Sequence, residues 1–97
     1  MKKRTERDLE IECQKLARAK GVAALKIENN GNSGVPDTLF VANGGNVLFV
    51  EFKRPDGRGN ASREQLFWHS FLGSSVSVVC SVEDFKKVFE QHFGIML

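Results

Sequence analysis

The sequence has few of the residues that mark several protein classes. Its 97 residues include two cysteines, two prolines, one tryptophan and no tyrosine. Cys13 and Cys80 are too few for a disulfide scaffold and lack the spacing of zinc ligands. No apolar run approaches the roughly 20 residues of a membrane-spanning helix, and no apolar signal segment follows the basic start at residues 2–4. We therefore expect a cytoplasmic protein without membrane contact.

The composition that remains is that of a small folded domain. Hydrophobic residues make up 41% and charged residues 27% of the chain, the usual globular mix. A chain of this length supplies one hydrophobic core, so residues 1–97 are predicted to form a single domain. The 14 basic residues exceed the 12 acidic ones by only two, so net charge alone does not indicate a nucleic-acid partner.

The basic residues are nevertheless grouped. Residues 2–7 and residues 53–63 each hold four basic side chains against one acid. The second group lies in a glycine-containing stretch, RPDGRGNASR. Such a stretch is either a solvated loop or an arm that contacts phosphate oxygens without reading sequence.

Hydrophobic periodicity and turn residues predict the element order α-β-β-β-α-β-α, an α/β fold with a mixed sheet flanked by helices. Thr5, Ser62 and Ser81 stand as N-caps, each with a capping-box partner three residues later. The apolar run at residues 47–50 favours a central strand covered on both faces. The helices are expected at residues 5–20, 62–72 and 81–92, and the strands at residues 23–27, 38–42, 47–53 and 76–80.

Glu51 and Lys53 interrupt this apolar central strand. A carboxylate there is costly to bury unless it is paired, protonated or bound to a cation. Because side chains alternate along a strand, Glu51 and Lys53 are expected on the same face. The two residues are therefore candidates for a site at the end of this strand.

The preceding strand is expected to bring a second carboxylate to the same place. Residues 43–46, Asn-Gly-Gly-Asn, predict a hairpin turn. Counting outward from a four-residue turn sets Thr38 opposite Glu51. Asp37 then lies near Glu51 and Phe52.

Two carboxylates this close repel each other unless a cation lies between them. Magnesium takes few carboxylates, prefers oxygen ligands and retains waters, so the backbone carbonyl of Phe52 could complete the protein's share. Lys53 could orient an attacking water. This combination is suited to metal-assisted hydrolysis of a phosphodiester by Asp37, Glu51, Phe52 and Lys53. Each feature alone is more often structural: Asp37 could belong to a turn, and Glu51 and Lys53 could form a solvated pair at a strand end.

The motifs GVPD (residues 34–37) and VEFKRP (residues 50–55), followed by Ser62 and Gln65, resemble the virus-type replication-repair nuclease (VRR-NUC) domain of the PD-(D/E)xK superfamily. The resemblance spans about residues 6–84. It implies a restriction-endonuclease-like core and a DNA endonuclease that depends on Mg²⁺ or Mn²⁺. Standalone members look like Holliday-junction resolvases that act as dimers, which implies branched DNA as substrate and a homodimer.

The resemblance also implies roles for single residues. Asp37, Glu51 and the carbonyl of Phe52 would be metal ligands, Lys53 would position the water, and Gln65 would support Lys53 or the scissile phosphate.

The family also carries a glutamate on its first helix, and here Glu6, Glu10 and Glu12 compete for that role. Glu6 fits best by its distance from Gly21, and it is then a further catalytic and metal-ligating candidate. The helix dipole also favours a glutamate in a first turn without any catalytic role. The choice between the three stays open.

Three aromatic residues, Phe67, Trp68 and Phe71, lie on one predicted helix. They could stack on bases, but their spacing favours the core or a subunit interface. Two alternative functions also remain. One is a non-catalytic nucleic-acid-binding module of the same fold, and the other is a protein-interaction domain, which would show no salt-dependent affinity for DNA.

Overall fold

The elements follow the predicted order. The structure is a computed structural model, and it describes residues 5–28, 34–54 and 63–97. The α/β fold with a mixed sheet and flanking helices is confirmed. The elements are α1 (Glu6–Ala19), β1 (Ala23–Lys26), β2 (Thr38–Val41), β3 (Val47–Phe52), α2 (Arg63–Leu72), the 3₁₀ turn η1 (Gly73–Ser75), β4 (Val76–Val79) and α3 (Val82–Phe93).

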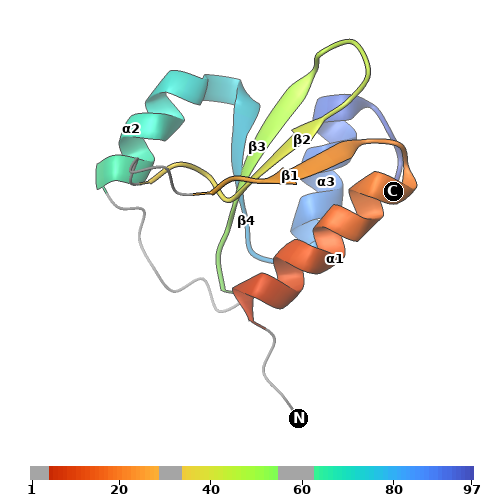
Figure 1. The fold of residues 1–97 in the computed structure, drawn as a ribbon, viewed down its shortest axis with the longest axis horizontal. Helices are drawn as coiled ribbons and strands as arrows, with labels where there is room; N and C mark the ends of the chain where they lie inside the picture. Colours follow the sequence, from red (N-terminus) through yellow and green to blue (C-terminus); the bar gives the residue numbers. More distant parts are fainter. Residues whose placement is uncertain (1–4, 29–33, 55–62) are drawn as a thin grey trace.

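The four strands form one sheet in the order β1-β2-β3-β4, in which only β3 and β4 run parallel among the described strands. Helices α1 and α3 lie side by side against one face of this sheet (Figure 1). The hydrophobic core fills the space between the two layers. Its buried residues are Leu9, Cys13, Ala17, Val22, Ala24, Phe40, Leu48, Val50, Phe52, Val79, Phe85 and Phe89.

The prediction that β3 is covered on both faces is wrong for part of the strand. β3 is an interior strand, and Leu48 and Val50 are completely buried under the helices. Val47 and Phe49 point to the opposite face and are only half-buried, because α1 and α3 both pack on the other side. The interior position of a strand therefore did not imply helices on both of its faces.

The turn between β2 and β3 is one residue shorter than predicted. The Ala42 N–H donates to the carbonyl of Asn46 at 2.9 Å, so these two residues close a three-residue loop. Gly44 and Gly45 within the loop have φ values of +89° and +83°, which residues with a Cβ rarely adopt. The glycine pair thus permits the tighter turn.

This shorter turn shifts the strand register. Thr38 pairs with Val50 rather than with Glu51, so the predicted pairing is wrong by one position. Continued by one residue beyond β2, the observed register sets Asp37 directly opposite Glu51. The correction therefore brings the two acids closer together than the sequence predicted.

Two predicted helix caps lie within the described residues. Thr5 and Asp8 form the predicted reciprocal capping box at the start of α1, with bonds of 3.0 and 3.1 Å. Ser81 accepts the Asp84 N–H at 3.0 Å, but the Asp84 carboxylate accepts from the Cys80 N–H instead of completing a box. Of the two hydrogen bonds of the predicted capping box at the start of α3, only the one accepted by the Ser81 side chain is therefore present.

Several sequence features lie outside the described residues. These include the predicted cap Ser62 and four of the eight basic side chains of the two groups, which are Lys2, Lys3, Arg4 and Arg58. In the part of the chain that the structure describes, no helix has the length and apolar character needed to span a bilayer.

A glycine holds the start of α2 close to the loop that leads into β2. Gly34 has a φ of +83°, and a Cβ there would overlap the backbone of Glu64 and Gln65. Only glycine fits this position without a shift of the helix. The contact places the first turn of α2 beside the segment that carries Asp37.

Candidate active site

Asp37 is oriented by the backbone of β3. Its Oδ2 accepts a hydrogen bond from the N–H of Phe52 at 2.8 Å. The Phe52 side chain is 1% exposed in the core, so this donor has a fixed position. The bond holds the Asp37 carboxylate at the end of β3, beside Glu51.

Glu51 is a buried acid next to another acid. It is 5% exposed, and its Oε1 is buried without a hydrogen-bond partner among the described residues. Burial, the charge of Asp37 and a hydrogen bond between the two carboxyl groups raise the pKa of Glu51 to about 8. In the protein without a bound cation, this pair therefore retains a proton at neutral pH.

Lys53 lies beside this pair. Its Nζ donates to Oε1 of Gln65, on α2, at 3.3 Å. Its backbone N–H donates to the carbonyl of Val79 at 2.9 Å, so the pairing with β4 continues past the end of β3. The positive charge of Lys53 opposes the rise in the pKa of Glu51. Backbone and side chain thus both hold this amine near the acids.

Of the three glutamates on α1, Glu6 faces the site. Figure 1 shows the start of α1 close to the end of β3, and the negative charge of Glu6 contributes to the raised pKa of Glu51. Glu6 itself is exposed. Glu12 lies elsewhere, in the wall of a hollow of about 380 Å³ that Cys80 and Lys86 also line.

Glu10 belongs to a different cluster, which sequence reasoning missed. It is 4% exposed, and its Oε1 accepts from Lys26 at 2.8 Å, Thr38 at 3.1 Å and Gln14 at 3.4 Å. Lys26 and Thr38 are direct partners in the β1–β2 register. Strand alternation, which points both side chains toward α1, was the signal that could have revealed this cluster.

The acids fit a hard cation. Within residues 5–28, 34–54 and 63–97, no three His, Cys, Asp or Glu side chains gather to hold a metal, so the carboxylates of Asp37 and Glu51 stand as a pair. Mg²⁺ and Mn²⁺ suit such a pair, because carbonyl and water oxygens complete their shells. A cation would relieve both the repulsion between the acids and the unsatisfied Glu51 Oε1.

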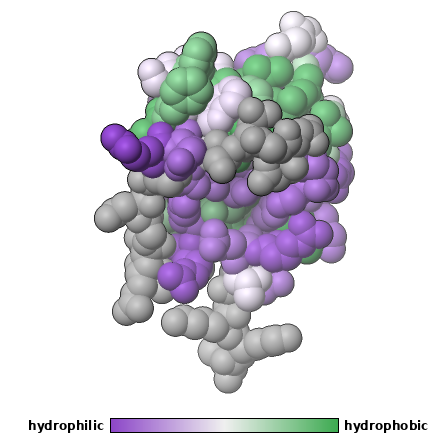
Figure 2. Space-filling view, turned by 60° about the vertical axis from the view of Figure 1, so that its left-hand side comes forward, coloured by the Kyte–Doolittle hydropathy of each residue, from purple (hydrophilic) through white to green (hydrophobic). Residues whose placement is uncertain are grey.

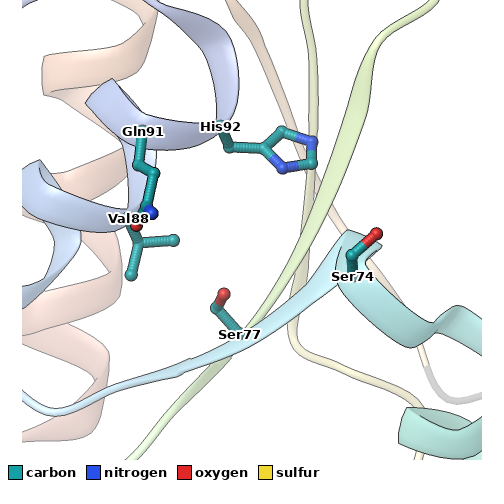
Figure 3. A pocket seen from close by; sticks show the side chains of 5 residues that line it. All are labelled: Ser74, Ser77, Val88, Gln91 and His92. Carbon is teal, nitrogen blue, oxygen red and sulfur yellow. The ribbon is translucent and has the colours of Figure 1, made fainter.

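Another hollow, of about 260 Å³, lies between β4 and α3 (Figure 3). In this view the His92 ring points toward the strands, where its Nε2 lies 2.7 Å from the carbonyl of Val47. Among the described residues, its lining contains no carboxylate and no lysine, which are the groups that the Asp37–Glu51 site offers for phosphodiester hydrolysis. The lining residues are Ser74, Ser77, Val88, Gln91 and His92.

Comparison with known proteins supports the resemblance noted in the sequence. A solved structure described as a VRR_NUC domain matches with a TM-score of 0.78 and 27% sequence identity, covering 91% of this chain and 97% of that chain. No family model matches the sequence, and no curated protein does. The VRR-NUC fold of the chain is therefore shown, and the likeness supports a nuclease-type domain.

Proposed function

We propose, taking the VRR-NUC fold as the premise, that residues 1–97 form one divalent-metal-dependent, structure-selective DNA endonuclease domain. In this proposal it hydrolyses phosphodiester bonds in branched DNA, in the manner of a Holliday-junction resolvase, and acts as a homodimer. The observation that supports it most is the buried Glu51 beside Asp37, with a carboxylate oxygen that has no hydrogen-bond partner among the described residues. Mg²⁺ or Mn²⁺ is the cation that best suits this pair.

The carboxylates of Asp37 and Glu51 and the backbone carbonyl of Phe52 would hold the ion. Glu6 is a further candidate, because its charge acts on Glu51 from the start of α1. A divalent ion bound there supplies Lewis acidity, which polarises a phosphoryl oxygen and makes water a better nucleophile. The hydrogen bond from the Phe52 N–H keeps one oxygen of Asp37 in a fixed orientation toward β3.

Lys53 would position the attacking water and stabilise the negative charge of the phosphoryl oxygens. Gln65 accepts a hydrogen bond from the Lys53 amine and thereby limits where that amine points. Arg54 and Arg63 are exposed on either side of residues 55–62. They suit contacts to backbone phosphates, which carry little sequence information.

A cleavage assay on labelled four-way junctions, flaps and linear duplexes tests the proposal. We expect the parent protein to cut a branched substrate with Mg²⁺ or Mn²⁺, and a chelator to stop the reaction. Lys53→Ala should bind the same DNA but cut it far more slowly. Salt-dependent binding of the parent protein with no cutting in either metal would instead favour the non-catalytic nucleic-acid-binding module.

A further inference from the structure

The face of the sheet turned away from α1 and α3 carries the candidate active site at one end and apolar side chains beside it. We call it the second face. Its side chains along β3 are those of Val47, Phe49 and Glu51, followed by Lys53, because alternate residues of a strand share a face. Val47 and Phe49 are half-buried. The second face therefore changes from apolar to charged between Phe49 and Glu51.

Strand β4 extends the apolar part of the second face to a position beside Glu51. In the register of the two strands, Val76 is the partner of Phe49 and Val78 is the partner of Glu51. Val78 is 43% exposed, on a strand at the edge of the described sheet. Neighbouring strands lie about 4.8 Å apart. An exposed apolar side chain thus lies next to the carboxylate that is proposed to hold the metal.

Helix α2 turns one side toward the second face and the other toward solvent. Gln65 marks the inner side, because its side chain contacts Lys53. At about 100° per residue, His69 lies about 40° around the helix from Gln65. Phe67 and Phe71 lie about 200° and 240° around and are 56% and 72% exposed. The prediction of a core position is therefore wrong for these two phenylalanines, and a subunit interface stays a prediction for them.

His69 carries a polar atom that the described residues leave unsatisfied. Its Nε2 is buried without a hydrogen-bond partner, and among the described residues Glu51 Oε1 is the other buried side-chain atom of this kind. Buried polar atoms are nearly always hydrogen-bonded. Helix α2 stays beside β3, since Gln65 contacts Lys53 near its start and η1 at its end contacts the strand. One unsatisfied atom therefore lies on the second face, and the other on the side of α2 turned toward it.

We propose that the second face and His69 bind an unpaired nucleobase of the DNA strand held at the candidate active site. The inference rests on the proposed function and names the part of the substrate that this site recognises. A nucleobase has two apolar faces, one of which Phe49 and Val78 would cover. Its polar edge would bond to His69 Nε2, which donates or accepts according to the tautomer.

The order of side chains along β3 fits one nucleotide. Lys53 lies at the end that suits phosphate, and Phe49 lies about 6.6 Å from Glu51 in the other direction, which is within the length of a nucleotide. β3 runs downward in Figure 1, and Figure 2 keeps the vertical direction. Figure 2 shows hydrophobic side chains mainly in the upper part of the molecule and hydrophilic ones mainly below. The same direction therefore leads from an apolar surface to a charged one.

This contact would favour branched DNA over plain duplex. In a duplex the faces of a base are stacked and its Watson–Crick edge is paired, whereas an unpaired base presents both to a protein. The nucleotides at a branch point are the ones most easily unpaired. Base contact by Val78 and His69 would thus supply structure selectivity without reading sequence strongly.

Binding of two single strands without metal tests the inference. The probes are a fluorescently labelled oligothymidylate and a strand of equal length in which abasic tetrahydrofuran units replace every nucleotide. Both carry the same phosphates, so the ratio of their dissociation constants isolates the bases. Fluorescence anisotropy in chelator should show that the parent protein binds the oligothymidylate about tenfold more tightly, the effect of about one well-covered base.

Val78→Ser should lower this ratio by at least about threefold, because a hydroxyl replaces apolar surface beside Glu51. The matched control is Leu25→Ser, since Leu25 is 54% exposed on β1, at the opposite edge of the sheet. This control should keep the parent's ratio. His69→Leu should also lower the ratio, and His69→Gln, which keeps a polar group near the position of Nε2, should restore most of it.

A ratio near one in the parent protein, or equal ratios in Val78→Ser and Leu25→Ser, would overturn the inference. A ratio lost in Phe71→Ser but kept in Val78→Ser would also overturn it, because the bases would then bind the solvent side of α2. Misfolding lowers both affinities and leaves their ratio unchanged. Base preference without cleavage of any substrate would contradict the proposed function alone, and cleavage of branched DNA with a ratio near one would contradict the base contact alone.

Discussion

Glu10 and Glu51 are buried to the same extent but have opposite electrostatic surroundings. Their exposed fractions are 4% and 5%. Glu10 accepts hydrogen bonds from Lys26 and Thr38, whereas Glu51 lies beside Asp37 and has one carboxylate oxygen without a partner among the described residues. The balance of neighbouring charge, rather than burial, therefore distinguishes an acid that stabilises the fold from one suited to a cation.

The two acids also connect different parts of the molecule. Glu10 joins α1 to β1 and β2, because its partners Lys26 and Thr38 lie on those strands. Glu51 lies at the end of β3, near the segment before β2, and the charges of Asp37, Lys53 and Glu6 act on it. We therefore expect changes around Glu10 to lower stability, and changes around Glu51 to lower metal binding and cleavage.

The largest expected effect is on catalysis. Lys53→Ala should lower the rate of metal-dependent cleavage by about 10² to 10⁴-fold, the range of a positioned proton-transfer or charge-stabilising group. The matched control is Lys26→Ala, which removes a lysine from the Glu10 cluster. Single-turnover cleavage rates are measured for both variants. Equal losses of cleavage rate would contradict the assignment of catalysis to the Glu51 region and of stability to the Glu10 region.

The next effect is on metal affinity. Asp37→Asn replaces one of the two carboxyl groups that would hold the ion and should weaken Mn²⁺ binding by at least about tenfold. Glu10→Gln should leave the affinity nearly unchanged, since Glu10 is bound to Lys26. Isothermal titration calorimetry with Mn²⁺ measures both variants. If Mn²⁺ binding is weakened in Glu10→Gln and not in Asp37→Asn, the metal binds at Glu10, and the proposed site at Asp37 and Glu51 is wrong.

A smaller effect is expected in the pH dependence of stability without metal. The pKa of Glu51 is raised from 4.5 to about 8, so the folded protein binds this proton more tightly than the unfolded chain does. The stability contributed by protonated Glu51 is complete below about pH 4.5 and is lost as the pH rises to about 8, by up to a few kcal/mol.

Urea unfolding in chelator between pH 5 and pH 9 measures this loss. The Glu51→Gln variant should lack the Glu51 contribution, because the amide does not titrate. Addition of Mg²⁺ or Mn²⁺ at pH 8 should restore stability to the parent protein but not to the variant. An unchanged pH profile in Glu51→Gln would contradict the raised pKa.

The smallest expected effect is on stability around Glu10. Lys26→Met leaves the Glu10 carboxylate buried without its closest cation and should lower the free energy of unfolding by about 1–2 kcal/mol. The side chain of Lys26 is 42% exposed, so solvent screening keeps the loss below that of a fully buried pair. The exposed Lys87 on α3, changed to Met, is the control and should show little change in urea unfolding.

Local patterns in the sequence predicted the elements and their order well. The capping box of Thr5 and Asp8 was predictable because its partners are three residues apart. The hairpin was predictable from its glycines, but its register was not. Whether the turn is closed by Ala42 and Asn46 depends on one hydrogen bond that the sequence alone does not specify.

The candidate site was predicted in part. The hairpin argument correctly brought Asp37 near Glu51, because the two residues lie on adjoining segments of the chain. The sequence did not decide which of Glu6, Glu10 and Glu12 belongs to the site, because all three lie within two turns of one helix. Their different neighbours come from strands distant in sequence, such as Lys26 and Thr38, which are 16 and 28 residues from Glu10.

The order of helices and strands, the hairpin and the grouping of Asp37, Glu51 and Lys53 follow from the sequence by itself, because each depends on residues close together in the chain. Only the tertiary structure decided that Glu10 meets a lysine and Glu51 another acid, and that α2 leaves two phenylalanines exposed. Those outcomes depend on how separate elements pack, and packing sets the distances between charges and the area that remains in contact with water.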